Sequence, residues 1–492
     1  MALPLLSLIT FTPLAGSLVI LFLPKQKVPL IRWVATAASL VTLALSILLV
    51  VRFSQTQTTM QFEEKALWIG SINVWYHLGV DGISVGLIFL TTLLGFLACL
   101  GSFGIQTRQK EYFFLYLLLC TGMLGTFLAL DLVLFYVFWE IVLVPMFFLI
   151  GVWGGPRKEY AAIKFFLYTL AGSVFMLLAI LALYFKSSPH TFSIPELTAN
   201  AGLLPLAFQI PVFIGFYLAF AVKVPIFPFH TWLPDAHVEA PTPISVLLAG
   251  VLLKMGGYGF FRISFPVLRD AAHFFAMPLA LLGTINIVYG ALVAMAQTDF
   301  KKMVAYSSVS HMGFILLGLA SMSSTGLNGA LLQMFNHGII TGALFFLVGV
   351  LYDRAHTRDL NAFGGLGAKT PVYAGLLIFF SLASLGLPGL SGFVSEFLSL
   401  LGTYPVFKAV TMLSTVGLVL TAGYFLIMLQ KILLGPLNPK WSNLADINRW
   451  ELGTLVPLGI LVLVVGIYPL SALQYQAAAI TDLVQKVAGV AF

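Results

Sequence analysis

Residues 132–152 read LVLFYVFWEIVLVPMFFLIGV and contain a single charged side chain, Glu140. Roughly 20 apolar residues in a helix span the hydrocarbon core of a bilayer, so this stretch predicts a transmembrane helix. The whole chain of 492 residues has a similar composition, since 60% of it is apolar and only 9% is charged. An ordinary soluble protein carries roughly 25% charged residues. The composition therefore excludes soluble enzymes, nucleic-acid-binding proteins and disordered chains, and it predicts an all-α polytopic membrane protein.

Fourteen apolar runs are long enough to cross a membrane. They lie at about 3–23, 31–51, 82–104, 112–130, 132–152, 160–185, 208–228, 243–263, 272–296, 302–320, 328–350, 371–403, 409–434 and 453–473. The first run lacks the basic flank and the cleavage site of a signal peptide, so we expect it to be retained. The longest loop, 52–81, has room for a small hairpin around Trp68 to Tyr76.

Basic residues predict the orientation of these helices, because cytoplasmic loops carry an excess of Lys and Arg. Loops and flanks after odd-numbered helices carry 16 basic residues, and the opposite loops carry seven. We call the first side the basic face and predict that it is cytoplasmic or equivalent, with both termini on the other side. The 16 residues are Lys25, Lys27, Arg32, Arg108, Lys110, Arg157, Lys158, Lys164, Lys301, Lys302, Arg354, Arg358, Lys369, Lys431, Lys440 and Arg449.

Four ionisable residues lie deep inside apolar runs. Glu140 lies in LFYVFWEIVLVP, Lys223 in LAFAVKVPIF, Lys254 in LLAGVLLKMGGYG and Glu396 in SGFVSEFLSLLG. A charge at the centre of a bilayer costs at least about 2.5–3.5 kcal/mol, so such residues face the bundle interior, pair with one another or line water. They are either structural ion pairs between helices or a path for protons or cations, and we favour the path.

Two histidines lie in neighbouring predicted helices, His311 in AYSSVSHMGF and His337 in QMFNHGIITG. Imidazole takes up and releases protons near neutral pH, so both are candidate relay residues. The segment 227–241, FPFHTWLPDAHVEAP, is expected to be a polar cap or a proton entrance at the basic face. It has no recognisable ligand spacing, and the two cysteines have no CxxC spacing, so we expect no metal site.

Two of the runs are interrupted by proline and glycine. One contains Pro225 and Pro228, and the other contains the sequence GLPG at 386–389. Irregular backbone in a membrane is tolerated where protein or water satisfies its polar groups, which is typical of transport sites. The two broken helices, the seventh and the twelfth, are five helices apart, which predicts an inverted repeat of helices 4–8 and 9–13. We therefore predict one membrane domain, 1–492, with helices 1–3 in 1–104, repeats in 105–263 and 272–434, and helix 14 in 435–492.

Four long motifs resemble one known family. They are FAVKVPIFPFHTWLPDAHVEAP at 220–241, LLAGVLLKMGGYGFFR at 247–262, DFKKMVAYSSVSHMGF at 299–314 and SLGLPGLSGFVSEF at 384–397. These motifs are similar to those of the antiporter-like, proton-pumping subunit M or chain 4 of complex I, and the resemblance covers nearly the whole chain. SSTGLNGA at 323–330 and LYDR at 351–354 look most like the cyanobacterial and chloroplast versions.

The resemblance implies a proton channel made of Glu140 paired with Lys223, followed by Lys254, His311, His337 and Glu396. It implies no cofactor in this chain, with NAD(P)H or ferredoxin, iron–sulfur clusters and plastoquinone in the rest of the complex. The implied partners are other membrane subunits, including sister antiporter-like subunits, and lipid, with no nucleic acid.

The implied location is a cyanobacterial thylakoid membrane, with a bacterial inner membrane or a chloroplast thylakoid as alternatives. Two other functions stay open at this point. A subunit of a multisubunit Na⁺/H⁺ antiporter shares these motifs, and a scaffold subunit that no longer pumps is also compatible with the fold.

Overall fold

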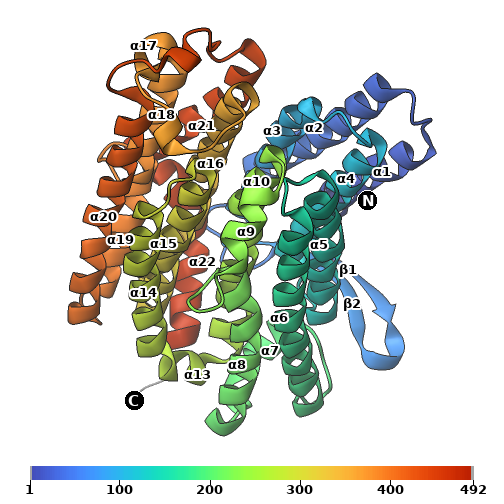
Figure 1. Cartoon of the computed structure of the whole chain (residues 1–492). Helices are drawn as coiled ribbons and strands as arrows, with labels where there is room; N and C mark the ends of the chain where they lie inside the picture. The colour runs from blue at the N-terminus through green and yellow to red at the C-terminus, as the bar shows by residue number, and fades with distance from the viewer. Residues whose placement is uncertain (1–2, 489–492) are drawn as a thin grey trace.

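The computed structural model describes residues 3–488 and is almost entirely helical (Figure 1). Within these residues, thirteen helices are long and apolar enough to cross a membrane. The twelfth of the fourteen predicted runs is divided into two shorter helices, so all fourteen runs form helix as predicted. The chain is an all-α polytopic membrane protein, and the predicted domain that begins at Met1 and ends at Phe492 extends beyond the described residues at both ends.

The described first half of the chain forms nine α-helices, the predicted hairpin and α10, which begins the central helix. Their bounds are α1 Leu5–Phe22, α2 Val28–Arg52, β1 Gln61–Ile69, β2 Val74–Val80, α3 Val85–Gly101, α4 Gln109–Leu128, α5 Leu132–Trp153, α6 Lys158–Lys186, α7 Ile194–Ala199, α8 Leu206–Lys223, α9 Trp232–Glu239 and α10 Thr242–Leu247. The strands pair antiparallel, with Ala66 opposite Tyr76. This confirms the hairpin predicted in the longest loop.

The rest of the chain contains the broken twelfth run and two helices at its C-terminal end. The bounds are α11 Leu253–Gly259, α12 Phe265–Val267, α13 Arg269–Phe274, α14 Ala276–Met295, α15 Phe300–Ser321, α16 Ser324–Ala355, α17 Leu366–Lys369, α18 Pro371–Ser384, α19 Ser391–Thr403, α20 Lys408–Leu433, α21 Arg449–Ile467 and α22 Leu470–Ala488. The last span, predicted over 453–473, begins and ends earlier than predicted, at Arg449 and Ile467. The helix α21 ends before Pro469, whose ring cannot continue it, and α22 follows separately.

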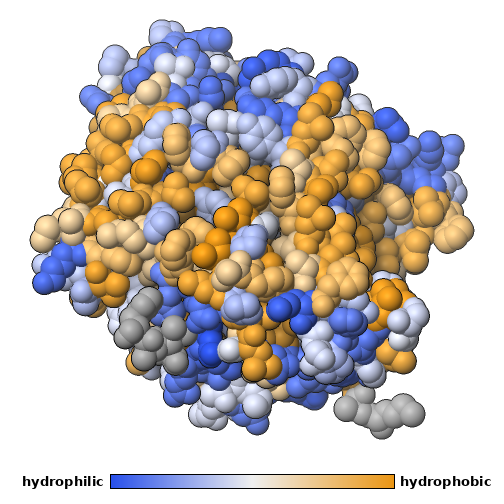
Figure 2. Space-filling view, turned by 90° about the horizontal axis from the view of Figure 1, so that it is seen from below, coloured by the Kyte–Doolittle hydropathy of each residue, from blue (hydrophilic) through white to orange (hydrophobic). Residues whose placement is uncertain are grey.

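Large apolar side chains on α1, α2, α6, α20 and α21 point outward, as expected for helices in contact with lipid. A band of apolar residues crosses the middle of the face shown in Figure 2, with hydrophilic residues above and below it. Residues 242–267, by contrast, do not face lipid: they run as one continuous helix through α10, α11 and α12, and all of them except Thr242 are buried. This central helix contacts α3, α8 and α16, so it is the core around which the bundle packs.

Contacts between loops agree with the predicted sidedness. Arg157, after the fifth span, lies 3.6 Å from Asp235, after the seventh. Arg358, after the eleventh span, lies 3.1 Å from Asp299, after the ninth. Loops that follow odd-numbered spans therefore meet on one side of the bundle, which is the basic face.

Both predicted breaks are present. The helix α8 ends at Lys223, and α18 ends at Ser384 before α19 begins at Ser391. In the second break Gly386 and Gly389 have φ values of +83° and +92°, which only glycine adopts without strain. Each break therefore positions a buried ionisable residue, Lys223 or Glu396, next to irregular backbone. The inverted repeat itself stays a prediction.

Candidate functional site

Lys254 lies at the centre of the buried central helix, and its ammonium group is bound by two partners. Its Nζ atom is 2.6 Å from Nδ1 of His337 on α16, and it also donates to the carbonyl oxygen of Ala249. The turn at Leu248–Leu252 is a π-helix, a wider turn that often marks functional sites. Because Lys254 is completely buried, these two contacts are what stabilise its polar head in the bundle.

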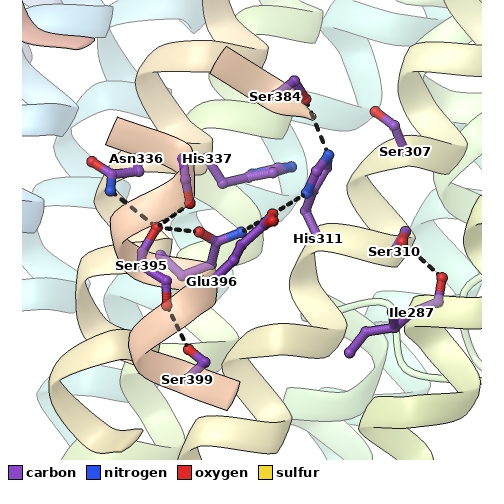
Figure 3. A network of polar contacts seen from close by, with 12 residues as sticks. Ile287, Ser307, Ser310, His311, Asn336, His337, Ser384, Ser395, Glu396 and Ser399 are labelled. Atoms are coloured by element: carbon purple, nitrogen blue, oxygen red, sulfur yellow. Dashed lines mark hydrogen bonds and ion pairs between the residues drawn. The ribbon is translucent and has the colours of Figure 1, made fainter. Parts of the chain in front are cut away.

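His311 and Glu396 form a second buried pair, between α15 and α19 (Figure 3). Nδ1 of His311 is 2.7 Å from Oε1 of Glu396, and Nε2 is 3.0 Å from the hydroxyl oxygen of Ser384. The same Glu396 oxygen accepts a hydrogen bond from the amide of Gln333 at 3.3 Å. The imidazole is thus held at both nitrogens, with the carboxylate on one side and the end of α18 on the other.

The two pairs face each other across a small cavity. The ring centroids of His337 and His311 are 5.7 Å apart, and both rings line a cavity of about 10 Å³ together with Glu396. That volume is close to the minimum that a single water molecule needs. Nε2 of His337 and Oε2 of Glu396 have no hydrogen-bond partner within the described residues. One water between them would therefore complete a hydrogen-bonded chain.

We call Lys254, His337, His311 and Glu396 the relay series. The sequence identifies all four residues, and the structure brings them together from four separate helices: α11, α16, α15 and α19. Each of them is at most 3% exposed. A lysine, two imidazoles and a carboxylate in this arrangement can exchange a proton between neighbours without a charge entering the lipid.

Lys223 occupies a different environment. Its Nζ atom lies 5.2 Å from the ring centre of Trp139 and 5.6 Å from that of Phe165, and it makes no hydrogen bond within the described residues. The attraction between an ammonium group and an aromatic face is worth about 2 kcal/mol or more when the cation is desolvated. The two aromatic rings therefore contact the Lys223 ammonium group directly, and the charge of Glu140 acts on it from further away.

No salt bridge or hydrogen bond in residues 3–488 joins Glu140 and Lys223, but the Glu140 carboxylate acts electrostatically on the Lys223 ammonium group, so the pair that the resemblance implies stays a prediction. Glu140 is partly exposed on α5 and shares a helical stripe with Val144 and Phe148, which are 50% and 44% exposed. Residues four apart lie on the same side of a helix. Glu140 therefore reaches the outer surface with only part of its side chain, since its Oε1 atom is buried and has no hydrogen-bond partner within the described residues.

The segment 227–241 is a short helix and not only a polar cap. The imidazoles of His230 and His237 are buried on and beside α9, and neither has a hydrogen-bond partner within the described residues. Asp235 accepts a hydrogen bond from Lys164 at 2.7 Å, which ties α9 to α6 at the basic face. Lys301, which the sequence assigns to a loop flank, is buried and donates to the carbonyl oxygen of Ala240.

The sequence does not single out several residues that the structure places at the site. Ser384 and Gln333 bind the His311–Glu396 pair, and Trp139 and Phe165 surround Lys223. Serine, glutamine and aromatic residues are common in membrane helices, so only their positions in space reveal these roles. The one sequence signal that could have pointed to Ser384 is the break between α18 and α19, because a broken helix leaves backbone polar groups that need partners nearby.

Residues 129–429 match the family described as NADH:quinone oxidoreductase/Mrp antiporter, TM. The chain is 42% identical to NADH-quinone oxidoreductase subunit M of Rickettsia bellii, over 98% of this chain and 99% of that protein. It is 43% identical to NAD(P)H-quinone oxidoreductase chain 4 1 of Synechococcus, over 96% and 91%. The chain therefore belongs to the antiporter-like family of complex I membrane subunits, in its subunit M or chain 4 group.

Two solved structures have nearly the same fold over almost the whole chain. A chain of respiratory complex I from Thermus thermophilus has a TM-score of 0.88 and 32% identity, covering 97% of this chain and 99% of that one. A chain of the Mrp complex from Dietzia has a TM-score of 0.86 at 20% identity, covering 99% and 100%, a likeness that concerns the fold alone. The chain is thus an integral membrane subunit of a kind that occurs in multisubunit complexes.

Proposed function

We propose that this chain carries protons across the membrane as a subunit of an NADH-quinone oxidoreductase, while other subunits carry out the redox reaction. The observation that supports this proposal is the relay series, a nearly continuous run of proton-exchanging groups buried in an apolar bundle. Fixed structural ion pairs would not need two histidines on either side of a cavity. The family relationship supplies the expected driving reaction.

The relay series gives each residue a distinct task. Lys254 receives a proton arriving from the Lys223 side, and it passes the proton to Nδ1 of His337. One water in the cavity would carry the proton from Nε2 of His337 to Oε2 of Glu396, whose Oε1 atom is in contact with Nδ1 of His311. Every step is a transfer between groups in contact or separated by about one water molecule, so no isolated charge has to cross hydrocarbon.

The partial exposure of Glu140 supports neighbouring membrane subunits as partners. A partly exposed carboxylate in the middle of a spanning helix is costly against lipid, and a polar or basic group of another subunit would satisfy it. We propose that a sister antiporter-like subunit lies on this face of α5, and that Glu140 couples the two chains. Lipid covers the apolar outer surfaces of α1, α2 and α20.

The donor and the quinone are a separate part of the proposal. The name of the Synechococcus relative supports NAD(P)H as donor and a quinone as acceptor, and that of the Rickettsia relative supports NADH. Ferredoxin as an alternative donor, plastoquinone as acceptor and a thylakoid or bacterial inner membrane as location belong to the proposal alone. We also propose that the iron–sulfur clusters belong to other subunits. This chain has only Cys99 and Cys120, and a cluster is usually held by four protein ligands.

Proton transport by the purified complex tests this function. Complex that contains the chain, reconstituted in vesicles with NADH and a quinone, should acidify one compartment at a rate that follows electron transfer and does not depend on sodium. A pH-sensitive dye inside the vesicles measures this. Sodium-dependent proton exchange without any electron donor would instead identify an Na⁺/H⁺ antiporter subunit.

The separation of Glu140 from Lys223 gives a second prediction. Since the two side chains make no direct contact and interact only through space, the effects of Glu140→Gln and Lys223→Met on thermal stability should be coupled by only about 1 kcal/mol. A direct buried pair would give a much larger coupling, since removing one partner of such a pair costs about 3–5 kcal/mol. Denaturation midpoints of the two single variants and the double variant decide between these outcomes.

A further inference from the structure

A larger cavity, of about 240 Å³, lies among α2, α3, α16 and α21 and beside α22, and it shares no lining residue with the small cavity of the relay series. Apart from three residues of α22, its lining is apolar. Val464 in this lining is 44% exposed on the outer surface of α21, whereas Leu332 on α16 is only 1% exposed. The cavity therefore reaches from the lipid-facing surface of the bundle into its interior.

The depth of this cavity is close to that of one leaflet of a bilayer. It lies on the side opposite the basic face, where α3 begins at Val85, α16 begins at Ser324 and α21 ends at Ile467. At about 1.5 Å per residue, Gly86 lies about 2 Å from the start of α3, and Phe335 lies about 16 Å from the start of α16. The hydrocarbon core of a bilayer is about 30 Å thick, so each leaflet contributes about 15 Å. The cavity thus extends over the depth that one acyl chain occupies.

The polar and apolar groups of the lining are separated along this depth. The polar residues Ser471, Tyr475 and Gln476 belong to α22, which follows the end of α21 at that side of the bundle. The amide of Gln476 donates to the carbonyl oxygen and the side-chain oxygen of Asn328, at 2.8 and 3.0 Å. Leu332 lies one turn deeper on α16. An apolar pocket with a few polar groups at one end binds a ligand in one orientation, and this one fits an amphiphile whose polar end lies at the surface.

We infer that this cavity binds one acyl chain of a membrane phospholipid, with the headgroup beside α22. Phospholipid is the amphiphile that surrounds an integral membrane protein, and the opening beside Val464 is continuous with the surface that faces lipid. An apolar cavity of about 150 Å³ holds a benzene molecule, so one of 240 Å³ accommodates several methylene groups of a chain. The inference does not depend on proton transport, so its failure would leave the proposed function unchanged.

Photochemical labelling of the whole complex tests this inference. The complex is placed in phosphatidylcholine nanodiscs that contain a phosphatidylcholine with a diazirine on one acyl chain, and the labelled residues are identified by mass spectrometry. A chain in the cavity should label Val85 and Leu332, which line it and are each 1% exposed, out of reach of the surrounding lipid. Val419, which is 73% exposed on α20, serves as the reference for labelling by that surrounding lipid.

Two glycines give a matched pair of variants. A Cβ atom at Gly86, in the lining, meets no neighbouring atom within 4 Å, and the same is true of Gly375, which is exposed on α18 outside the cavity. We expect Gly86→Leu to lower the labelling of the two buried residues, relative to Val419, at least about fivefold, because leucine and the acyl chain compete for the same space. Gly375→Leu should leave this ratio unchanged.

Labelling of Val419 without labelling of Val85 and Leu332 would overturn the inference, and so would labelling of these two residues that Gly86→Leu does not reduce. If an excess of a long-chain quinone suppresses their labelling and the same excess of unlabelled phosphatidylcholine does not, the occupant is an isoprenoid tail and the inference is wrong. Should the Gly86→Leu complex fail to assemble, Ala472→Leu fills the cavity from α22, and the same comparison applies to it.

Discussion

Complexes carrying Lys254→Met are expected to assemble normally and to lose nearly all proton pumping. Methionine has a similar length and stays compatible with the apolar surroundings of the central helix, but it cannot bind or release a proton. The contact of 2.6 Å to His337 is then lost, and the relay series begins with an imidazole that has no donor. We expect the proton-to-electron ratio contributed by this subunit to fall at least tenfold.

Lys486→Met is a matched control for this variant, because Lys486 is 47% exposed on α22 and is paired only with Asp482 in the next turn. It should leave pumping unchanged. Proton release per NADH oxidised, measured in vesicles with the same amount of assembled complex, gives the comparison. A Lys254→Met complex that keeps the full ratio would contradict the relay series as the route.

Replacing Arg262 by methionine is expected to cause the largest loss of stability. Its guanidinium group binds both oxygens of Asp81, one of them at 2.8 Å, and donates to the hydroxyl of Tyr258 at 3.0 Å. Both members of this pair are buried, with exposures of 6% and 4%. Removing one partner leaves an unpaired buried charge and costs about 3–5 kcal/mol.

The double variant Asp81→Asn with Arg262→Met should be more stable than Arg262→Met alone, because it leaves no unpaired charge. Arg449→Met, at the exposed start of α21, is the control and should have little effect. Thermal denaturation of the solubilised complex, followed by the loss of helical signal, measures all three. Equal midpoints for Arg262→Met and the control would show that the pair does not stabilise the fold.

The Asp81–Arg262 pair also predicts that the stability of the fold depends on pH. Burial alone would raise the pKa of Asp81, but the charge and hydrogen bonds of Arg262 outweigh burial and hold this pKa below its usual value. A lowered pKa in the folded protein means that the carboxylate stabilises the fold above its unfolded pKa of about 3.9. This stabilisation is present at neutral pH and is lost as the pH falls below about 4, whereas the Asp81→Asn variant should not show that loss.

Much of the fold follows from local sequence. A run such as 132–152 must be a spanning helix, because nothing else satisfies its backbone in lipid, and the fourteen runs predict the fourteen helical regions. The breaks also follow, since Pro225 and Pro388 interrupt a helix, and Gly386 and Gly389 readily adopt the positive φ values of the second break. The end of the last span at Ile467 was missed, because Leu470 continues the apolar pattern on the far side of Pro469.

The sequence by itself determined the membrane class, the helices and the six candidate residues, because an ionisable side chain within an apolar run is conspicuous and costly wherever it points. Only the tertiary structure decided which of them meet. Lys254, His337, His311 and Glu396 come together, whereas Glu140 and Lys223 interact without a hydrogen bond or salt bridge between them. The reason is that the direction of a side chain depends on how each helix is rotated against its neighbours, and this rotation is set by packing over distances that no local pattern encodes.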